Sequence, residues 1–277
     1  NTPIKSIFLI NLLFLSILVG NSRASFTRPG DMMRVPSLTQ KSENKLFSIT
    51  MGSEVVNPLG AESSNAFSIN KNFSNNAEFS ISWTQLNKYA ERGDKDTEVG
   101  FHVQTKILEY GHFDLLVGLQ DFLVRSGQRV VYLDSMSPFF LFSSNQAYDD
   151  YHLIIQFGAG GGKIGYDSQK NAIGGRSLGP MAGMILYLPY FKDNGGARLI
   201  MEYIGSGVNV GISVPFSPQY QFHFGITNLQ SISKSNIMIS DLAEEEEIIE
   251  TSSAISLGLT IDIPRLSKKE KNNVDQP

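Results

Sequence analysis

The sequence predicts an all-β fold, a single antiparallel transmembrane β-barrel of about twelve strands. Three observations lead to this prediction. Apolar and polar residues alternate along most of the chain, the polar positions of the clearest segments carry small neutral side chains, and short connections alternate with long ones. A barrel with short periplasmic turns and long extracellular loops produces all three patterns. The chain of 277 residues is long enough for one such domain.

The clearest alternation lies in residues 208–228, which we interpret as a hairpin of two strands. One face carries Val, Ile, Phe and Tyr, and the other carries Asn, Gly, Ser, Gln, His and Thr. A period of two residues is typical of a strand. The polar face has no Lys, Arg, Asp or Glu. Bulky apolar residues opposite small neutral ones favour a barrel with its apolar face toward lipid and its polar face toward a lumen.

Ten further stretches extend this pattern, and none shows a convincing helical period. The twelve expected strands span residues 46–52, 66–73, 77–86, 97–110, 112–124, 138–146, 151–161, 181–190, 197–204, 208–216, 220–229 and 252–264. An even number of antiparallel strands is the rule for single-chain outer-membrane barrels, and it places both ends of the barrel domain on the periplasmic side.

The expected connections fall into two classes by length. The extracellular ones are 53–65, 87–96, 125–137, 162–180 and 230–251, which are long, and a tight turn at 205–207. The periplasmic ones are 74–76, 111, 147–150, 191–196 and 217–219, which are short. Aromatic residues beside the short turns predict an interfacial girdle. These residues are Tyr110, Tyr148, Tyr151, Tyr187, Tyr190, Phe191, Phe216 and Tyr220.

The composition agrees with an exported membrane barrel. Charged residues make up 18% of the chain, below the average of about 25% for soluble domains. A formal net charge of −4 gives no electrostatic support for nucleic-acid binding. Because the chain has no cysteine, it has no disulfide, no thiolate metal site, no cysteine nucleophile and no lipoprotein anchor.

The N-terminus predicts export. Lys5, the apolar run 7–19 and the small residues around Ala24 fit a signal peptide over residues 1–24. We expect a lead-in segment over 25–45, periplasmic or lumenal, a barrel over 46–264, and a disordered polar tail over 265–277. The expected location is the outer membrane of a Gram-negative cell. The expected partners are outer-membrane lipid, the barrel-assembly machinery and a solute or polysaccharide.

Two stretches carry a family resemblance. Residues 28–38 read R-P-G-D-M-M-R-V-P-S-L, with Val35-Pro36-Ser37 at the centre, and Glu202-Tyr203 is followed by a hairpin that begins at Asn209. Both stretches resemble those of YjbH-like outer-membrane barrels, which are linked to exopolysaccharide export. The resemblance implies a barrel that serves passage of an exopolysaccharide.

No motif for a metal or a cofactor is present. The glycines of 158–163 lack the first glycine and the Ser or Thr of a nucleotide-binding loop. None of the four histidines has metal-ligand spacing with another. His102, His152 and His223 could face the lumen, so an outer-membrane Ser–His lipid hydrolase stays open as an alternative. A secreted β-sandwich that binds glycans is the second alternative.

Parity within each expected strand selects the charged and histidine side chains that face the lumen. We therefore expect a channel or an export-associated, porin-like protein rather than an enzyme, with no catalytic residues and with these side chains on the path of the solute. The candidates are Glu78, Glu98, His102, Lys106, Asp114, His152, Glu202, His223 and Asp262.

Overall fold

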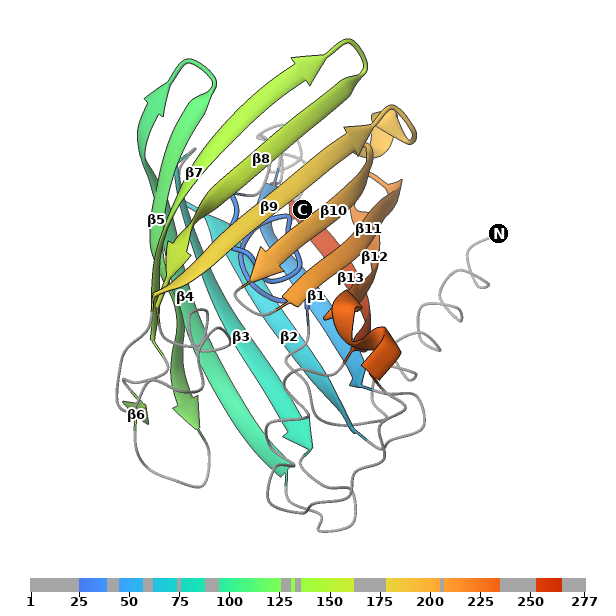
Figure 1. Ribbon diagram of the computed structural model, residues 1–277. Coiled ribbons are helices and arrows are strands. Elements are labelled where there is room, and N and C mark those ends of the chain that lie inside the picture. The colour runs from blue at the N-terminus through green and yellow to red at the C-terminus, as the bar shows by residue number, and fades with distance from the viewer. Residues whose placement is uncertain are drawn as a thin grey trace, which may run out of the picture.

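A computed structural model describes residues 25–38, 45–56, 62–73, 76–87, 95–125, 131–132, 136–161, 178–204, 207–234 and 253–265. The chain forms one closed antiparallel sheet (Figure 1). Its strands are β1 (Lys45–Val56), β2 (Glu62–Asn72), β3 (Ala77–Asn87), β4 (Lys95–Tyr110), β5 (Phe113–Arg125), β6 (Val131–Tyr132), β7 (Ser137–Tyr148), β8 (Tyr151–Gly160), β9 (Gly179–Leu188), β10 (Ala197–Ile204), β11 (Gly207–Ser217), β12 (Tyr220–Thr227) and β13 (Ala254–Pro264).

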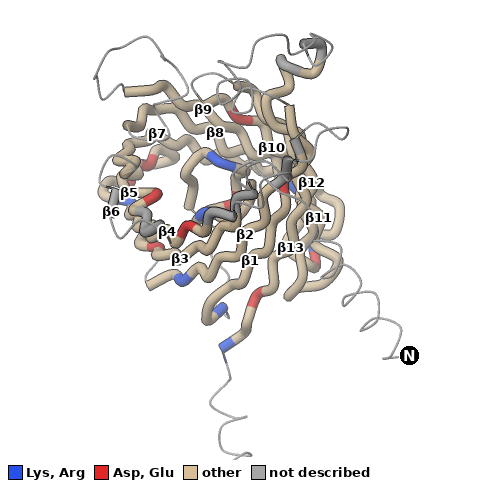
Figure 2. The backbone as a smooth tube through the Cα atoms, turned by 90° about the horizontal axis from the view of Figure 1, so that it is seen from below, with Lys and Arg blue, Asp and Glu red and all other residues tan. Residues whose placement is uncertain are grey.

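Strand pairing closes the sheet into a barrel of twelve strands. Apart from β6, each strand pairs with the next around the ring, with β5 pairing with β7 and β1 with β13. The two-residue strand β6 only extends the pairing of β5 beyond the point where β7 ends, so it is not part of the ring. Viewed along its axis, the wall is a ring of strands (Figure 2). The predicted fold class and strand number are therefore confirmed.

The connections at one end of the barrel are short, and we call this the short-turn end. They join β2 to β3, β4 to β5, β7 to β8, β9 to β10 and β11 to β12, and the 3-10 helix η2 (Lys192–Asn194) lies in one of them. The opposite end, the long-loop end, includes the connections that follow β8 and β12; the 3-10 helix η3 (Leu229–Lys234) begins the latter. No helix in the described part of the chain is long and apolar enough to span a membrane.

One predicted loop is wrong. The connection after β1 was expected to be long, over 53–65, but pairing between β1 and β2 continues to Val56 and Glu62. The alternation of Met51, Ser53 and Val55 with Gly52 and Glu54 simply continues past the expected strand end. The connection therefore spans only residues 57–61, and Glu54 belongs to the barrel wall rather than to a loop.

The barrel is apolar outside, and many of its inward-facing side chains are polar. Along β7, Phe139 and Leu141 are buried, whereas Phe140 and Phe142 are about 40% exposed on the outer face. On β3 and β4, Ser80 and Gln104 are fully buried, while Trp83 of β3 lies exposed outside. This reverses the usual distribution in soluble domains. The single closed sheet also excludes the β-sandwich alternative, which requires two sheets facing one another.

The aromatic residues beside the short turns are mostly on the outside, as the girdle prediction requires. Tyr110, Tyr148, Tyr151, Tyr190, Phe191 and Phe216 are all large exposed side chains at this end. Tyr187 is the exception. It is buried inside the barrel, and its hydroxyl donates a hydrogen bond to Asp31. The prediction is wrong for Tyr187 because its position in β9 has the parity of the inner face.

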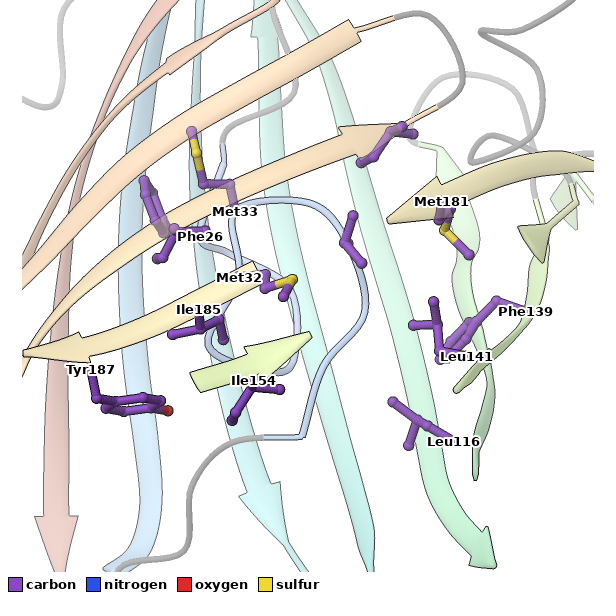
Figure 3. Close-up of a cluster of buried hydrophobic side chains, with 13 residues drawn as sticks. Phe26, Met32, Met33, Leu116, Phe139, Leu141, Ile154, Met181, Ile185 and Tyr187 are labelled. Carbon is purple, nitrogen blue, oxygen red and sulfur yellow. The ribbon is translucent and has the colours of Figure 1, made fainter. Parts of the chain in front are cut away.

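The inner wall is not uniformly polar, contrary to the expectation of a polar lumen. We call β5 and β7–β10 the apolar half-wall and β1–β4 with β11–β13 the polar half-wall. Every wall residue of the buried apolar cluster belongs to the apolar half-wall: Leu116, Phe139, Leu141, Ile154, Met181, Ile185, Tyr187, Ile200 and Ile204. Figure 3 shows this cluster, which also includes Phe26, Met32 and Met33 from residues 25–38; we call residues 25–38 the lumenal segment. In β5 and β7 both faces are apolar, so alternation alone does not show which is inside.

Candidate functional site: the lumenal segment and the cup beside it

The lumenal segment lies inside the barrel and is held by three ion pairs. The guanidinium of Arg28 donates to both carboxylate oxygens of Asp121 on β5, at 3.1 and 2.9 Å. Arg34 pairs with Glu54 of β1, and Asp31 pairs with Arg198 of β10. All six side chains are at most 15% exposed. Because the partners come from different sides of the ring, the segment is fixed across the lumen rather than against one wall.

Two buried carboxylates also hold the backbone of the segment. Glu202 accepts hydrogen bonds from the N–H groups of Arg34 and Val35, both at 3.0 Å, and from the Asn209 amide at 2.8 Å. Glu54 accepts hydrogen bonds from the N–H and the hydroxyl of Ser25, at 3.0 and 2.8 Å. Buried ionised groups need such partners, since desolvation otherwise disfavours them strongly.

The segment folds back on itself. The N–H of Phe26 donates to the carbonyl of Met33 at 2.9 Å. The Ser37 hydroxyl accepts hydrogen bonds from the N–H groups of Asp31 and Met32, at 2.8 and 3.2 Å. Gly30 has φ +108°, and a Cβ there would lie 2.2 Å from the Ser37 carbonyl oxygen. Only glycine fits this position, so residues 26–37 form a compact, self-bonded loop.

Glycines in the wall make room for the two methionines of the loop. A Cβ at Gly183 of β9 would lie 2.5 Å from Met32 Sδ, and a Cβ at Gly225 of β12 would lie 2.3 Å from Met33 Cε. Both methionines are almost fully buried. The inner wall is therefore shaped to fit this segment, as expected for a resident part of the barrel.

The Ser–His pairs of the lumen are not arranged for catalysis. Ser82 Oγ lies 2.8 Å from His102 Nε2, but the N–H of Asp121 donates to His102 Nδ1 at 3.2 Å. Nδ1 is therefore the unprotonated nitrogen, and Nε2 carries the proton that it donates to Ser82. A histidine in this tautomer cannot take a proton from the serine, which a nucleophile requires of its base.

His223 is bound on both ring nitrogens and covered on its face. Ser213 Oγ lies 2.7 Å from Nδ1, and Thr260 Oγ1 lies 2.8 Å from Nε2. The ring of Phe26 stacks on the imidazole with centroids 4.8 Å apart. Ser213 is completely buried, so no substrate reaches it. Both histidines hold the lumen together, and the geometry gives the hydrolase alternative no support.

The nine expected lumen residues divide into two groups by position. Glu78, Glu98, His102, Glu202 and His223 are buried in the wall, and Glu202 and His223 contact the lumenal segment. Lys106, Asp114, His152 and Asp262 are partly exposed nearer the short-turn end. There Lys106 Nζ lies 3.4 Å from Asp114 Oδ1, and Lys45 Nζ lies 2.7 Å from Asp262 Oδ1.

The expected set lacks four residues that hold the segment, namely Glu54, Gln104, Asp121 and Arg198; the Gln104 amide donates to the carbonyl of Ser37 at 2.5 Å. Glu54 was assigned to a loop, and Gln104 and Arg198 have lumenal parity but were not selected. Asp121 follows Gln120, and both are buried. Strict alternation would place Asp121 outside, but its φ of 55° and an irregular register opposite Phe101–Val103 turn it inward. No signal in the sequence marks this bulge.

A cavity of about 290 Å³ lies between the segment and the polar half-wall at the short-turn end. We call it the cup. Its wall comes from β1, β2 and β10–β13, its floor includes Phe26 and residues 30–32, and its rim includes the turns 193–195 and 217–219. Part of the expected lumen set lines it, namely His223 and Asp262.

No protein-family model matches the chain, and a search for similar curated proteins finds none. Among solved structures, a KdgM porin in complex with disordered oligogalacturonate matches at 13% identity, covering 78% of this chain and 99% of that one, with a TM-score of 0.44. The outer membrane protein Omp33 of Acinetobacter baumannii matches at 7% identity (79% and 99%, TM-score 0.42). Outer membrane phospholipase A from Escherichia coli matches at 9% (79% and 97%, TM-score 0.40). Matches with sequence identities and TM-scores this low assign neither a family nor a ligand to this chain.

Proposed function

We propose that this protein is a porin-like outer-membrane β-barrel that passes a polar solute, with the lumenal segment as its built-in constriction. The observation that supports this most directly is the closed sheet with large apolar side chains on its outer face and buried polar side chains inside. A closed barrel pairs every backbone group between strands, which is what a lipid environment demands. The short-turn end would then face the periplasm.

The dimensions support this proposal. Apart from β6, the strands have 8 to 16 residues, and a tilted strand of about 9–11 residues spans a bilayer. Barrels of eight strands are filled by their own side chains, and those of sixteen or more hold open channels. Twelve strands leave an interior of intermediate width, and the lumenal segment occupies part of it.

Passage is favoured over catalysis because the polar half-wall offers hydroxyls and amides to a hydrated solute, whereas the Ser–His pairs lack the geometry of a nucleophile and base. The signal peptide expected over 1–24, and all but the first residue of the tail expected over 265–277, lie outside the described residues, so export rests on the sequence. Fractionation with the outer membrane and heat-modifiable migration on gels test the location. A protein that is soluble without detergent would contradict it.

Single-channel recording in planar bilayers tests the passage itself. We expect a small unit conductance for the protein with residues 25–38 and a larger one for a variant that lacks them, because deletion removes the side chains that cross the lumen. Heat-modifiable migration of both proteins is the control for folding. If neither protein conducts, the barrel is a scaffold and the proposed passage is wrong.

An exopolysaccharide as the cargo is a further part of the proposal, and it rests on the YjbH-like stretches. One observation supports it: these two stretches contact one another in space, since Glu202 binds the backbone of Arg34 and Val35. The residues that carry the resemblance therefore include the lumenal segment and the carboxylate that binds its backbone. Loss of surface polysaccharide from a strain without this protein, restored by the wild type, is the expected result.

A further inference from the structure

The charges that line the cup already neutralise one another. Asp31 of the lumenal segment pairs with Arg198, and Lys45 of β1 lies 2.7 Å from Asp262 of β13. Asp193 is on an exposed turn at the rim. An ionic ligand in the cup would have to break one of these ion pairs. If the pairs stayed intact, the attraction of one side chain would be offset by repulsion from its partner. The lining therefore suits a ligand without net charge.

Three buried polar atoms around the cup have no hydrogen-bond partner among the described residues. They are the Asn70 side-chain oxygen, the Gln221 amide nitrogen and the Nε of Arg198. Buried polar groups in proteins are nearly always bonded. Other buried atoms without a hydrogen-bond partner lie elsewhere in the lumen, but these three border a cavity that has room for one. These atoms offer one acceptor and two donors. A hydroxyl group both donates and accepts, and it can satisfy either kind.

The rest of the lining agrees with a hydroxylated ligand. Ser48, Thr50 and Thr260 present hydroxyls, while Phe26 and Pro215 supply apolar surface. A sugar ring has the same mixture, with hydroxyls at its edge and C–H groups on its faces. The volume of about 290 Å³ lies at the lower limit for small-molecule sites. It admits a small molecule and excludes a long folded chain.

We propose that the cup is a binding site for a neutral, polyhydroxylated small molecule of one or two sugar rings. The molecule enters from the short-turn end and rests on the lumenal segment, with its hydroxyls on Asn70, Gln221 and Arg198. The site does not require the barrel to conduct, so its failure and the failure of the proposed passage are distinguishable.

Saturation-transfer difference NMR on the protein in lauryldimethylamine oxide micelles tests this proposal. The probes are glucose, galactose, mannose and maltose, with gluconate and glucosamine as charged comparators. We expect transfer to at least one neutral sugar, loss of that signal in both Asn70→Leu and Gln221→Met, and weak or no transfer to the charged probes. The matched control is Gln156→Met, because Gln156 is a buried lumenal glutamine with an unpartnered oxygen that does not line the cup.

Three results would overturn the inference. If none of the neutral sugars shows transfer with the wild type, water alone satisfies the orphan atoms. If a charged probe binds in place of the neutral ones, the ligand class is wrong. If transfer survives in both Asn70→Leu and Gln221→Met, or is lost equally in Gln156→Met, the ligand binds elsewhere. Heat-modifiable migration shows which variants are folded, and either cup variant suffices.

Discussion

The two half-walls of the lumen are built by the same alternation and yet present different chemistry inward. The polar half-wall supplies Glu54 and His223, which bind the lumenal segment through hydrogen bonds and ring stacking. The apolar half-wall supplies Leu116 and Leu141, which are buried among other apolar side chains. Its charged exceptions are Asp121, Arg198 and Glu202, which also bind the segment. The comparison teaches that alternation determines which residues point inward. Whether those inward-facing side chains are polar or apolar depends on what each half-wall packs against.

The largest expected effect comes from removing a carboxylate of the polar half-wall. In Glu54→Ala the guanidinium of Arg34 loses its ion pair with Glu54 while it is still buried, and the segment loses its anchor at Ser25. The cost of breaking a buried pair is about 3–5 kcal/mol. Urea unfolding in micelles measures it through the fluorescence of Trp83, the only tryptophan in the sequence and an outer-face residue. We also expect a larger unit conductance.

Glu109→Ala is the control for this variant. Glu109 also forms an ion pair, with Lys106, but its side chain is 63% exposed. Exposed pairs contribute about 1 kcal/mol or less. An equal loss of stability in the two variants would show that burial of the Glu54 pair is not what matters.

Cavity formation in the apolar half-wall is expected to cost somewhat less. Leu141→Ala removes a fully buried side chain from the cluster, and such truncations cost about 2–5 kcal/mol. Since Leu141 has none of the charged contacts that hold the segment, the unit conductance should stay close to that of the wild type. A rise in conductance as large as that of Glu54→Ala would mean that the half-walls do not act separately.

Arg28→Lys tests whether the bridge between the segment and β5 depends on geometry or only on charge. Lysine keeps the charge but cannot donate the two parallel hydrogen bonds that Nε and Nη2 of Arg28 give to Asp121. We expect a loss of about 1–2 kcal/mol by urea unfolding, in line with hydrogen bonds to charged groups. Wild-type stability in this variant would show that charge alone suffices.

The smallest effect is expected at a wall glycine. In Gly225→Ala the new methyl group meets the terminal methyl of Met33, which is flexible and can move aside. A loss of about 1 kcal/mol is expected, since overpacking of this kind costs about 1–3 kcal/mol. Combining it with Met33→Ala, which frees the space, should recover part of that loss. If the double variant loses the sum of the two single effects, the methionine and the glycine are not in contact in solution.

The sequence was sufficient for the fold because each strand carries its own signal. Segments such as 254–264 alternate so plainly that strand number, order and most boundaries could be predicted. It was not sufficient where two faces of a strand are alike, as in β7, or where a bulge breaks the alternation, as at Asp121. Residues 25–38 were expected to be periplasmic or lumenal, and no local pattern chooses between these. Their partners lie far away in the chain, with Arg28 bound to Asp121 and Val35 to Glu202.

The seam between β1 and β13 has a consequence for how the barrel assembles. Ser48 pairs with Asp262, so ring closure joins the two ends of the barrel sequence, and such non-local contacts make folding slow. The lumenal segment immediately precedes β1 in the chain and binds side chains of β5, β9 and β10, which come much later. The strand that closes the seam therefore also carries the segment into the lumen, and closure of the ring and burial of the segment belong to one late, slow step.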